Sequence, residues 1–323
     1  MATSPRLCPY TARMTTIALV TAISATGHDE DLLPLQSACE RAGLTARALA
    51  WDDASVGWGR MGAALLRSPW DYTERLPEFM AWCERTAHAV PLLNPLPVIR
   101  WNTDKHYLAD LAAVGIPVVT TRFVEPDAEP MEALQRFLAA HDAAEFVVKP
   151  AVSAGARDTQ RYQRSQEFAA GNHLARLLDA GRSAMLQPYL PAVDADGETA
   201  LIHIDGRYSH AIRKGALLKI GDTSPLDPHA FGDIRNREPA EDERRLADQV
   251  LAAASRLLKL EQPLLYARID LLRGADGAPR LLELELTEPS LFFAQAPEAA
   301  DRLAQALLAR LADGTVRTRT DIG

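Results

Sequence analysis

The sequence predicts a chain of mixed class, with a parallel α/β lobe followed by a larger α+β region. Three observations lead to this prediction. Strand and helix patterns alternate from residue 14 to about residue 100. Beyond that point several strand patterns follow one another directly, joined by turns at Gly206 and at "GADGAP" (274–279). The 323 residues are 47% hydrophobic, which is enough for two or three packed lobes.

The first lobe is predicted to contain short parallel strands covered by helices. Strands are expected at 15–22, 45–51, 62–69 and 91–95, with helices at 29–43 and 73–87. Arg6 and Arg13 precede the apolar run "TTIALVTA", which loosely imitates a signal peptide. The run is short and diluted by Thr and Ser, so we interpret it as the first strand. Residues 1–13 are then an extension, and Met14 is an alternative start to Met1.

The second region is predicted to mix helices with antiparallel strands. Asn102 or Thr103 should cap a helix that ends at Gly115, which places Lys105 in its first turn, and a strand should begin with "IPVVTT" (116–121). Further strands are expected at 145–151, 184–190, 198–205 and 207–215, with helices at 130–141, 241–260 and from residue 297. The long loop 219–235 is a candidate functional loop.

Charge and composition exclude several classes of partner. A net charge of −8 argues against nucleic acid and against an acidic membrane surface. No run of about 18 apolar residues is present, so no transmembrane helix is expected. Cys8, Cys39 and Cys83 are widely spaced, which suits a reducing compartment and predicts a cytoplasmic protein. Standard P-loop, dinucleotide-binding, zinc-protease and hydrolase motifs are absent.

The segment "RIDLLRGADGAPRLLELELTEPS" (268–290) predicts a hairpin with an acidic face. If Arg273 faces Arg280, then Asp270 faces Glu283 and Arg268 faces Glu285. The leucines are expected on the opposite face: Leu271, Leu282, Leu284 and Leu286. Clustered carboxylates repel one another unless a cation neutralises them, and oxygen ligands suit Mg²⁺. The alternative is an ordinary solvated face, and the hairpin alone leaves both interpretations open.

Two lysines are candidate phosphate ligands. Lys149 follows the apolar strand pattern "EFVV", and Lys105 lies near a predicted helix start, where a cation opposes the helix dipole. Each lysine alone is better explained as an ordinary surface residue. Together with the hairpin they indicate a site for a nucleoside triphosphate.

At this point the pattern resembles the ATP-grasp superfamily, in its glutathione-synthetase-like branch. The resemblance implies a pre-ATP-grasp α/β domain (14–102), a lid or central region (103–190), a catalytic subdomain (191–313) and a tail (314–323). It implies ATP and two Mg²⁺ ions, with Asp270, Glu283 and Glu285 as metal ligands, although the family often has Asn at the position of Glu285.

The same resemblance implies roles for further residues in nucleotide binding and phosphoryl transfer. Lys105 and Lys149 match lysines that contact the phosphates, and the loop "VSAGARD", with Ser153 and Gly155, would cover them. The adenine would lie against the hinge Gln187, Pro188, Tyr189 and Leu190. Glu198, or alternatively Asp194, would bind the ribose. Arg213 and Arg268 would stabilise the transferring phosphoryl group.

The words "LLRSPWDYTERL" and "LLNPLPVIRWNTDKHYL" are similar to the D-cycloserine synthetase group, whose members cyclise O-ureido-D-serine with ATP. This resemblance implies a small amino-acid-like substrate, and Arg67 is expected to pair with its carboxylate. The expected pocket residues are Arg67, Ser68, Trp70, Asp71, Tyr72, Arg213 and Ser290. The alternative for the segment 67–72 is a packing cluster at the start of a helix.

Three functions remain open on the sequence. The first is a cyclo-ligase, in which an acyl-phosphate is attacked by a nitrogen of the same molecule. The second is a ligase that joins a carboxylate to a separate amine, as glutathione synthetases do. The third is a nucleotide-binding protein without turnover. His203 and His210 are expected to be structural, and family members suggest a homodimer through the first lobe.

Overall fold

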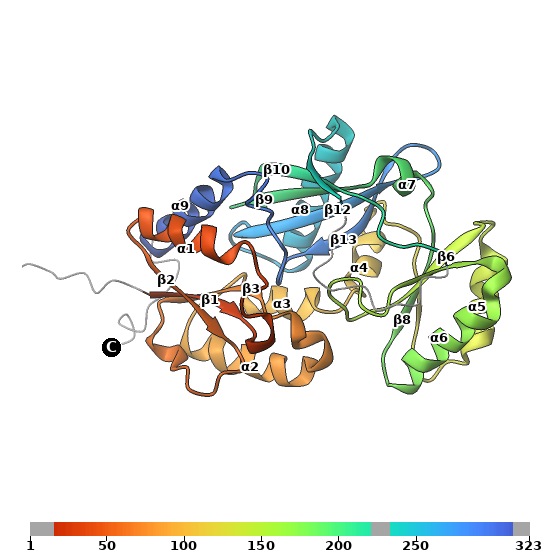
Figure 1. Ribbon diagram of the computed structural model, residues 1–323, viewed down its shortest axis with the longest axis horizontal. Coiled ribbons are helices and arrows are strands. Elements are labelled where there is room, and N and C mark those ends of the chain that lie inside the picture. Colours follow the sequence, from red (N-terminus) through yellow and green to blue (C-terminus); the bar gives the residue numbers. More distant parts are fainter. Residues whose placement is uncertain (1–15, 221–232, 313–323) are drawn as a thin grey trace, which may run out of the picture.

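The computed structural model describes residues 16–220 and 233–312 and contains three sheets that follow one another along the chain (Figure 1). The predicted extension 1–13, the choice between Met1 and Met14, the tail 314–323 and most of the loop 219–235 lie outside the described residues. Among the helices of the described part, none combines the length and apolar character needed to cross a bilayer.

The first sheet is parallel, in the order β2-β1-β3-β4. Its strands are β1 (Thr16–Thr21), β2 (Thr45–Ala50), β3 (Ala63–Ser68) and β4 (Leu92–Leu93). Successive residues of β1 are buried on opposite faces: Leu19 packs in a core with α1 (Leu32–Arg41), and Val20 packs in a core with α2 (Leu76–Ala89). Burial on both faces explains the continuous apolar run of this strand.

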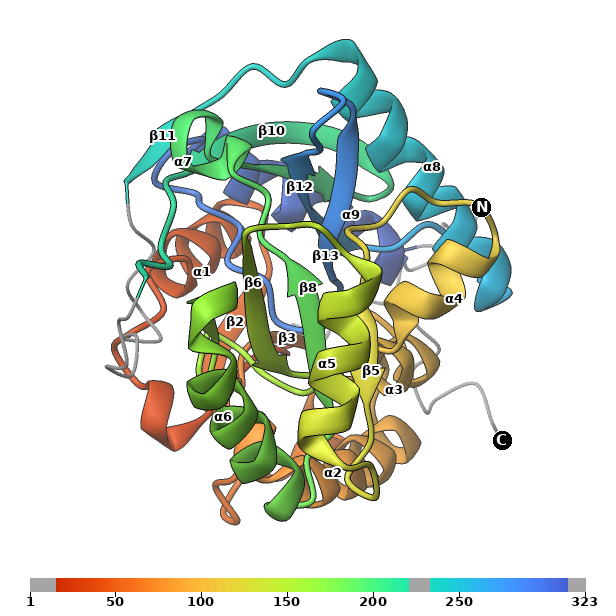
Figure 2. The same ribbon diagram turned by 90° about the vertical axis from the view of Figure 1, so that its right-hand side faces the viewer.

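The second sheet is antiparallel, in the order β5-β8-β6-β7. Its strands are β5 (Arg122–Val124), β8 (Ala184–Pro188), β6 (Glu145–Pro150) and β7 (Gln160–Gln163). Figure 2 shows α5 (Pro130–Ala140) and α6 (Glu167–Asp179) on the outer face of this sheet. The Glu129 carboxylate caps α5 by accepting the N–H groups of Met131 and Glu132.

The third sheet is antiparallel, in the order β11-β10-β9-β12-β13. Its strands are β11 (Ile234–Asn236), β10 (Arg207–Lys214), β9 (Glu198–Ile204), β12 (Tyr266–Arg273) and β13 (Pro279–Glu285). The helix α8 (Glu241–Leu257) packs against it. The helix α9 (Glu298–Ala312) packs against α1, so the first and third sheets share one core (Figure 1).

The predicted helix that ends at Gly115 is present as α4 (Tyr107–Ala113), but its start at Asn102 or Thr103 is wrong. Two helices, α3 (Leu96–Asn102) and α4 (Tyr107–Ala113), are separated by a turn, and Lys105 lies in that turn rather than in a helix. Asn102 is the last residue of α3. Its side-chain amide binds the backbone at the end of the hairpin 268–290, donating to Leu284 O at 2.7 Å and accepting from Leu286 N at 2.7 Å. The Asn102 side chain, which the local sequence pattern predicted to cap a helix, therefore forms a tertiary contact instead.

The strand predictions differ from the structure in three short segments. The segment "IPVVTT" contributes only an isolated bridge from Val118 to Leu281, and β5 begins at Arg122. The strands β7 and β11 were not predicted. Each has only three or four residues, too few for a recognisable alternation.

The hairpin register is confirmed at one end and corrected at the other. Asp270 faces Glu283 and Arg268 faces Glu285, as predicted. Beyond Asp270 a β-bulge shifts the pairing by one residue, so Arg273 faces Pro279 instead of Arg280. The bulge takes Leu282 out of the predicted buried face: Leu281, Leu284 and Leu286 are buried, and Leu282 is partly exposed.

Candidate active site

A cavity of about 340 Å³ lies between the second and third sheets, and the first lobe contributes to one part of its wall. The third sheet supplies charged side chains from β9, β10, β12 and β13. The second sheet supplies Lys149 from β6 and the segment after β8. The first lobe supplies residues of a short 3₁₀ helix, η3 (Trp70–Glu74). Leu282, displaced by the bulge, also lines this cavity.

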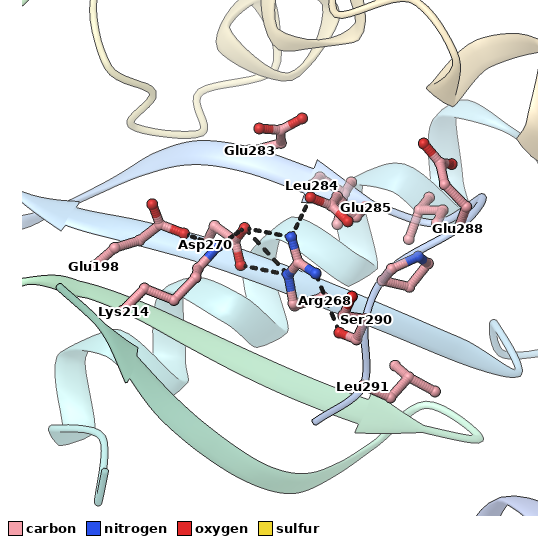
Figure 3. Close-up of polar contacts among 12 residues, drawn as sticks. Glu198, Lys214, Arg268, Asp270, Glu283, Leu284, Glu285, Glu288, Ser290 and Leu291 are labelled. Atoms are coloured by element: carbon pink, nitrogen blue, oxygen red, sulfur yellow. Dashed lines mark hydrogen bonds and ion pairs between the residues drawn. The ribbon is translucent and has the colours of Figure 1, made fainter. Parts of the chain in front are cut away.

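A row of alternating charges crosses the floor of the cavity (Figure 3). Lys214 Nζ lies 2.8 Å from Asp270 Oδ2 and also pairs with Glu198. Arg268 Nε lies 3.0 Å from Asp270 Oδ1, and its Nη2 pairs with Glu285. Because Arg268 and Lys214 both contact Asp270, they hold the pKa of that carboxyl well below its usual range, against the opposing effect of burial.

The two predicted lysines lie on the opposite wall, close to Glu283. Lys105 Nζ is 3.1 Å from Glu283 Oε1 and donates to Ser153 O at 2.7 Å. Lys149 is buried at the end of β6; burial and the nearby Lys105 together lower its pKa to about 8, against the opposing effect of Glu283. A buried lysine with so little compensation is well suited to receive an anion.

The carboxylates differ in how well their charge is compensated. Burial raises the pKa of Glu285 to about 8, with added repulsion from Glu283 and Asp270, although Arg268 opposes the shift. Burial likewise raises the pKa of Glu198 to about 7, opposed by Lys214. For Glu283, Lys105 and Lys149 outweigh the effect of burial and lower the pKa. The ionised form of Glu285 is therefore the least compensated of the three hairpin carboxylates.

The predicted hinge residues Gln187, Pro188, Tyr189 and Leu190 all line the cavity. The backbone N–H of Tyr189 donates to Glu145 O at 2.9 Å, so the fold already uses this group. Of the two predicted ribose carboxylates, Glu198 lines the cavity. Asp194 does not: it pairs with Arg161 at 3.2 Å and accepts from the Tyr189 hydroxyl at 2.5 Å.

The loop after β6 also meets the first lobe. Its residues Ser153 and Gly155 line the cavity as predicted, together with Arg157, which pairs with Glu74 of η3. Three positions of this loop have positive φ: 62° at Gly155, 56° at Ala156 and 55° at Asp158. This loop therefore joins the second sheet to the first lobe above the cavity.

The predicted substrate residues of the first lobe separate into two groups. Trp70, Asp71, Tyr72 and the later Ser290 line the cavity. Arg67 and Ser68 are fully buried and do not line it, which corrects the prediction that they contact the substrate directly. Arg67 donates to Pro289 O at 2.7 Å and lies 3.8 Å from Asp31, so its charge holds the segment after β13.

Arg213 is the other predicted residue that the structure does not place at the cavity. Its guanidinium donates to Asp196 O and Ala195 O on the outer side of β10. The adjacent residue Lys214 points into the cavity instead, because successive side chains of a strand face opposite sides. Lys214 was not among the predicted site residues, although the alternation of β10 beside the buried residues of β9 could have indicated it.

Glu288 is a second cavity residue that the sequence analysis missed as a functional group. It follows β13 in the quoted segment "LTEPS" and lines the cavity near Tyr72. Its position after the regular strand gives no alternation from which its direction can be predicted.

The donor set of the hairpin fits Mg²⁺. Asp270, Glu283 and Glu285 offer only oxygen atoms, and the raised pKa of Glu285 marks negative charge that a cation would compensate. Within residues 16–220 and 233–312, no group of three or more acidic, cysteine or histidine side chains is placed so that it could hold a metal ion, so Asp270, Glu283 and Glu285 do not form a complete metal site in this structure. Mg²⁺ does not require one, because it usually takes one or two carboxylates and completes its shell with water and phosphate oxygens.

The sequence of this chain is similar to that of D-cycloserine synthetases. Residues 17–94 match the family described as D-cycloserine synthetase DcsG, N-terminal domain. Over 296 residues the chain is 47% identical to the cycloserine biosynthesis protein DcsG of Streptomyces lavendulae, covering 91% of this chain and 98% of that protein.

Solved structures have a similar fold. The crystal structure of D-cycloserine synthetase DcsG has a TM-score of 0.88 and 46% identity, over 92% of this chain and 99% of that one. The D-alanine–D-alanine ligase from Bacillus anthracis has a TM-score of 0.63 and 14% identity, over 93% and 97% of the chains. The ATP-grasp ligase PsnB, complexed with minimal precursor, Mg and ADP, has a TM-score of 0.59 and 19% identity, over 92% and 98%. At these low identities the last two comparisons concern the fold alone.

Proposed function

The chain belongs to the D-cycloserine synthetase family of ATP-grasp ligases, and on that premise we propose that it cyclises O-ureido-D-serine to D-cycloserine with consumption of ATP. The strongest support is the 47% identity to the Streptomyces lavendulae protein, which extends over 91% of this chain and 98% of that protein's length. The ATP-grasp fold and the ligase activity predicted from the sequence are thereby confirmed.

The proposed reaction has two bond-forming steps. The substrate carboxylate attacks the γ-phosphorus of ATP, which gives an acyl-phosphate and ADP. The ureido nitrogen bonded to the serine oxygen then attacks the acyl carbon, loses its proton, and displaces inorganic phosphate. Ring closure leaves a carbamoyl group on the ring nitrogen, so hydrolysis, with release of carbon dioxide and ammonia, completes D-cycloserine.

The cations of the cavity support this chemistry. Lys105 and Lys149 on one wall, and Lys214 and Arg268 on the floor, surround the space above the hairpin. Fixed cations in a site shielded from water stabilise negative charge that develops on phosphoryl oxygens. Asp270, Glu283 and Glu285 would hold Mg²⁺, which would supply further neutralisation of the phosphate charge.

The other walls support nucleotide binding and exclusion of water. We propose that the hinge from Gln187 to Leu190 holds the adenine, that Glu198 binds the ribose, and that the loop with Ser153 and Gly155 covers the phosphates. Shielding is important because an acyl-phosphate hydrolyses readily. The scheme requires no protein nucleophile, and carboxylate activation is supplied by ATP.

The test is ADP release from Mg·ATP with O-ureido-D-serine, with the product identified by mass spectrometry. We expect release with this compound and a mass equal to that of D-cycloserine. The variant Glu283→Ala should lose ADP release, because Glu283 is both a hairpin carboxylate and the partner of Lys105. Wild-type release only in the presence of a separate amine would refute cyclisation and favour an intermolecular ligase.

Cellular location and assembly are two further parts of the proposal. We propose a cytoplasmic enzyme, which agrees with the free, buried thiols of Cys39 and Cys83 and with the need for ATP. A homodimer through the first lobe stays a prediction, and sedimentation analysis of the purified protein would test it.

A further inference from the structure

Glu288 differs from every other acidic residue that lines the cavity. Glu198, Asp270, Glu283 and Glu285 each pair with a lysine or arginine of the site, and Asp71 pairs with Arg75 at 3.0 Å. Glu288 has no ion pair with any residue in the described ranges 16–220 and 233–312. Its carboxylate is hydrogen-bonded to the Tyr72 hydroxyl. In Figure 3 it lies at the opposite end of the charged row from Glu198, and no dashed line reaches it.

The position of Glu288 is fixed by contacts from the first lobe. Trp70 Nε1 donates to Glu288 O at 3.3 Å, and Arg67 donates to the next carbonyl, Pro289 O, at 2.7 Å. The Asp31 carboxylate accepts three successive N–H groups a little further along, those of residues 291–293, at 2.5 to 3.1 Å. The carboxylate is therefore held in place at the cavity wall rather than on a loose loop.

The charge of Glu288 is not balanced by the protein alone. Burial raises the pKa of Glu288 to about 7 and Glu283 adds to this effect, while the hydrogen bond from Tyr72 and the charges of Lys105 and Arg268 oppose it. Both cations already have other partners: Lys105 pairs with Glu283, and Arg268 pairs with Asp270 and Glu285. A shielded carboxylate without a partner is costly, and a cationic group on a ligand would compensate it.

We propose that Glu288, together with the Tyr72 hydroxyl and the Trp70 ring, forms a subsite for the ammonium group of an α-amino-acid substrate. The inference rests on the proposed function in that it assigns one end of the same substrate. Arg268 and the lysines attract the carboxylate to the phosphoryl-transfer region, and Glu288 receives the ammonium beside it. A neutral ureido group would leave the carboxylate charge uncompensated, so it is directed elsewhere.

The test compares ligands with and without the ammonium group. O-ureido-D-serine and its deamino analogue, 3-(ureidooxy)propanoic acid, are titrated by calorimetry into the full-length protein saturated with Mg²⁺ and a non-hydrolysable ATP analogue. A second pair that differs in the same way, D-serine and 3-hydroxypropanoic acid, is titrated in parallel. The proteins are the wild type, Glu288→Gln, Tyr72→Phe, and Glu261→Gln as a matched control at an exposed site.

We expect the wild type to bind the ammonium-bearing member of a pair about 10- to 100-fold more tightly, the range for a hydrogen bond to a charged group. Glu288→Gln should abolish this preference and leave the affinity for the ATP analogue unchanged, and Glu261→Gln should behave as wild type. Equal weakening of both members, or absence of any preference in the wild type for both pairs, would overturn the inference.

Turnover separates this inference from the proposed function. ADP and product formation are measured on the wild type in the same series. A preference that depends on Glu288 without formation of D-cycloserine would refute the proposed reaction and retain the ammonium subsite. Formation of D-cycloserine with an unchanged KM and a lowered kcat in Glu288→Gln would retain the reaction and refute the subsite.

Discussion

Lys214 and Arg213 are adjacent cations on β10 with opposite surroundings, and they offer a matched test of the site. Lys214 points into the cavity and pairs with Asp270 and Glu198. Arg213 donates to two backbone carbonyls on the other side of the strand. Replacing each by methionine removes one charge and retains an unbranched apolar side chain. If only the cavity cation participates in phosphoryl transfer, the two variants should differ strongly in activity and modestly in stability.

The expected size of each effect follows from the partners left behind. In Lys214→Met, Asp270 keeps Arg268, and Glu198, whose pKa is already about 7, can take up a proton at little cost. The loss of stability should therefore be about 1 to 3 kcal/mol, less than the about 3 to 5 kcal/mol typical of a broken buried pair. The loss of a fixed cation should lower kcat by about 10² to 10³. Arg213→Met should change stability by less than about 1 kcal/mol.

The assays are ADP release with O-ureido-D-serine and urea unfolding followed by circular dichroism. Both variants must first show the same unfolding slope as the wild type, so that activity is compared between equally folded proteins. A loss of activity in Arg213→Met as large as that in Lys214→Met would refute the assignment of the cavity face of β10.

Three further outcomes follow from buried polar groups. Asp31→Ala should lower the free energy of unfolding by at least about 3 kcal/mol, because three N–H groups of residues 291–293 lose their acceptor; a urea midpoint equal to the wild type would contradict this. His173 lies 3.0 Å from the Tyr162 hydroxyl, and burial lowers its pKa to about 4. Below pH 6.5 the unfolded chain therefore binds more protons than the folded chain, so the free energy of unfolding should fall by about 3 kcal/mol between pH 6.5 and pH 4. In His173→Leu this part of the pH dependence, measured by thermal unfolding, should be reduced. Glu283→Gln should weaken Mg²⁺ binding, so that ADP release requires a higher Mg²⁺ concentration. An unchanged Mg²⁺ titration would show that Glu283 is not a metal ligand.

Local pattern predicted most of the regular elements because long elements have a clear period. The 17-residue helix α8 and the buried strand β1 were recognisable from their own residues. The short strands β7 and β11 were not, since they exist mainly through pairing with a neighbour. Asn102 has the residue type of a helix cap, and only the distant strand β13 revealed that its amide binds the backbone there.

The sequence by itself determined which chemical groups gather at the site. Strict alternation placed Asp270, Glu283 and Glu285 on one face of a hairpin, and a lysine at the end of an apolar strand indicated a buried cation. Tertiary structure decided which of two adjacent residues faces the cavity, as with Lys214 and Arg213, and it placed Arg67 behind the wall. The physical reason is that a shift of one residue in a strand reverses its faces, as the bulge at Leu282 does. Charge balance likewise depends on the three-dimensional arrangement. In the described part of the chain, the other carboxylates of the cavity each pair with a lysine or arginine, and Glu288 has no ion pair; this difference could be recognised only from the structure.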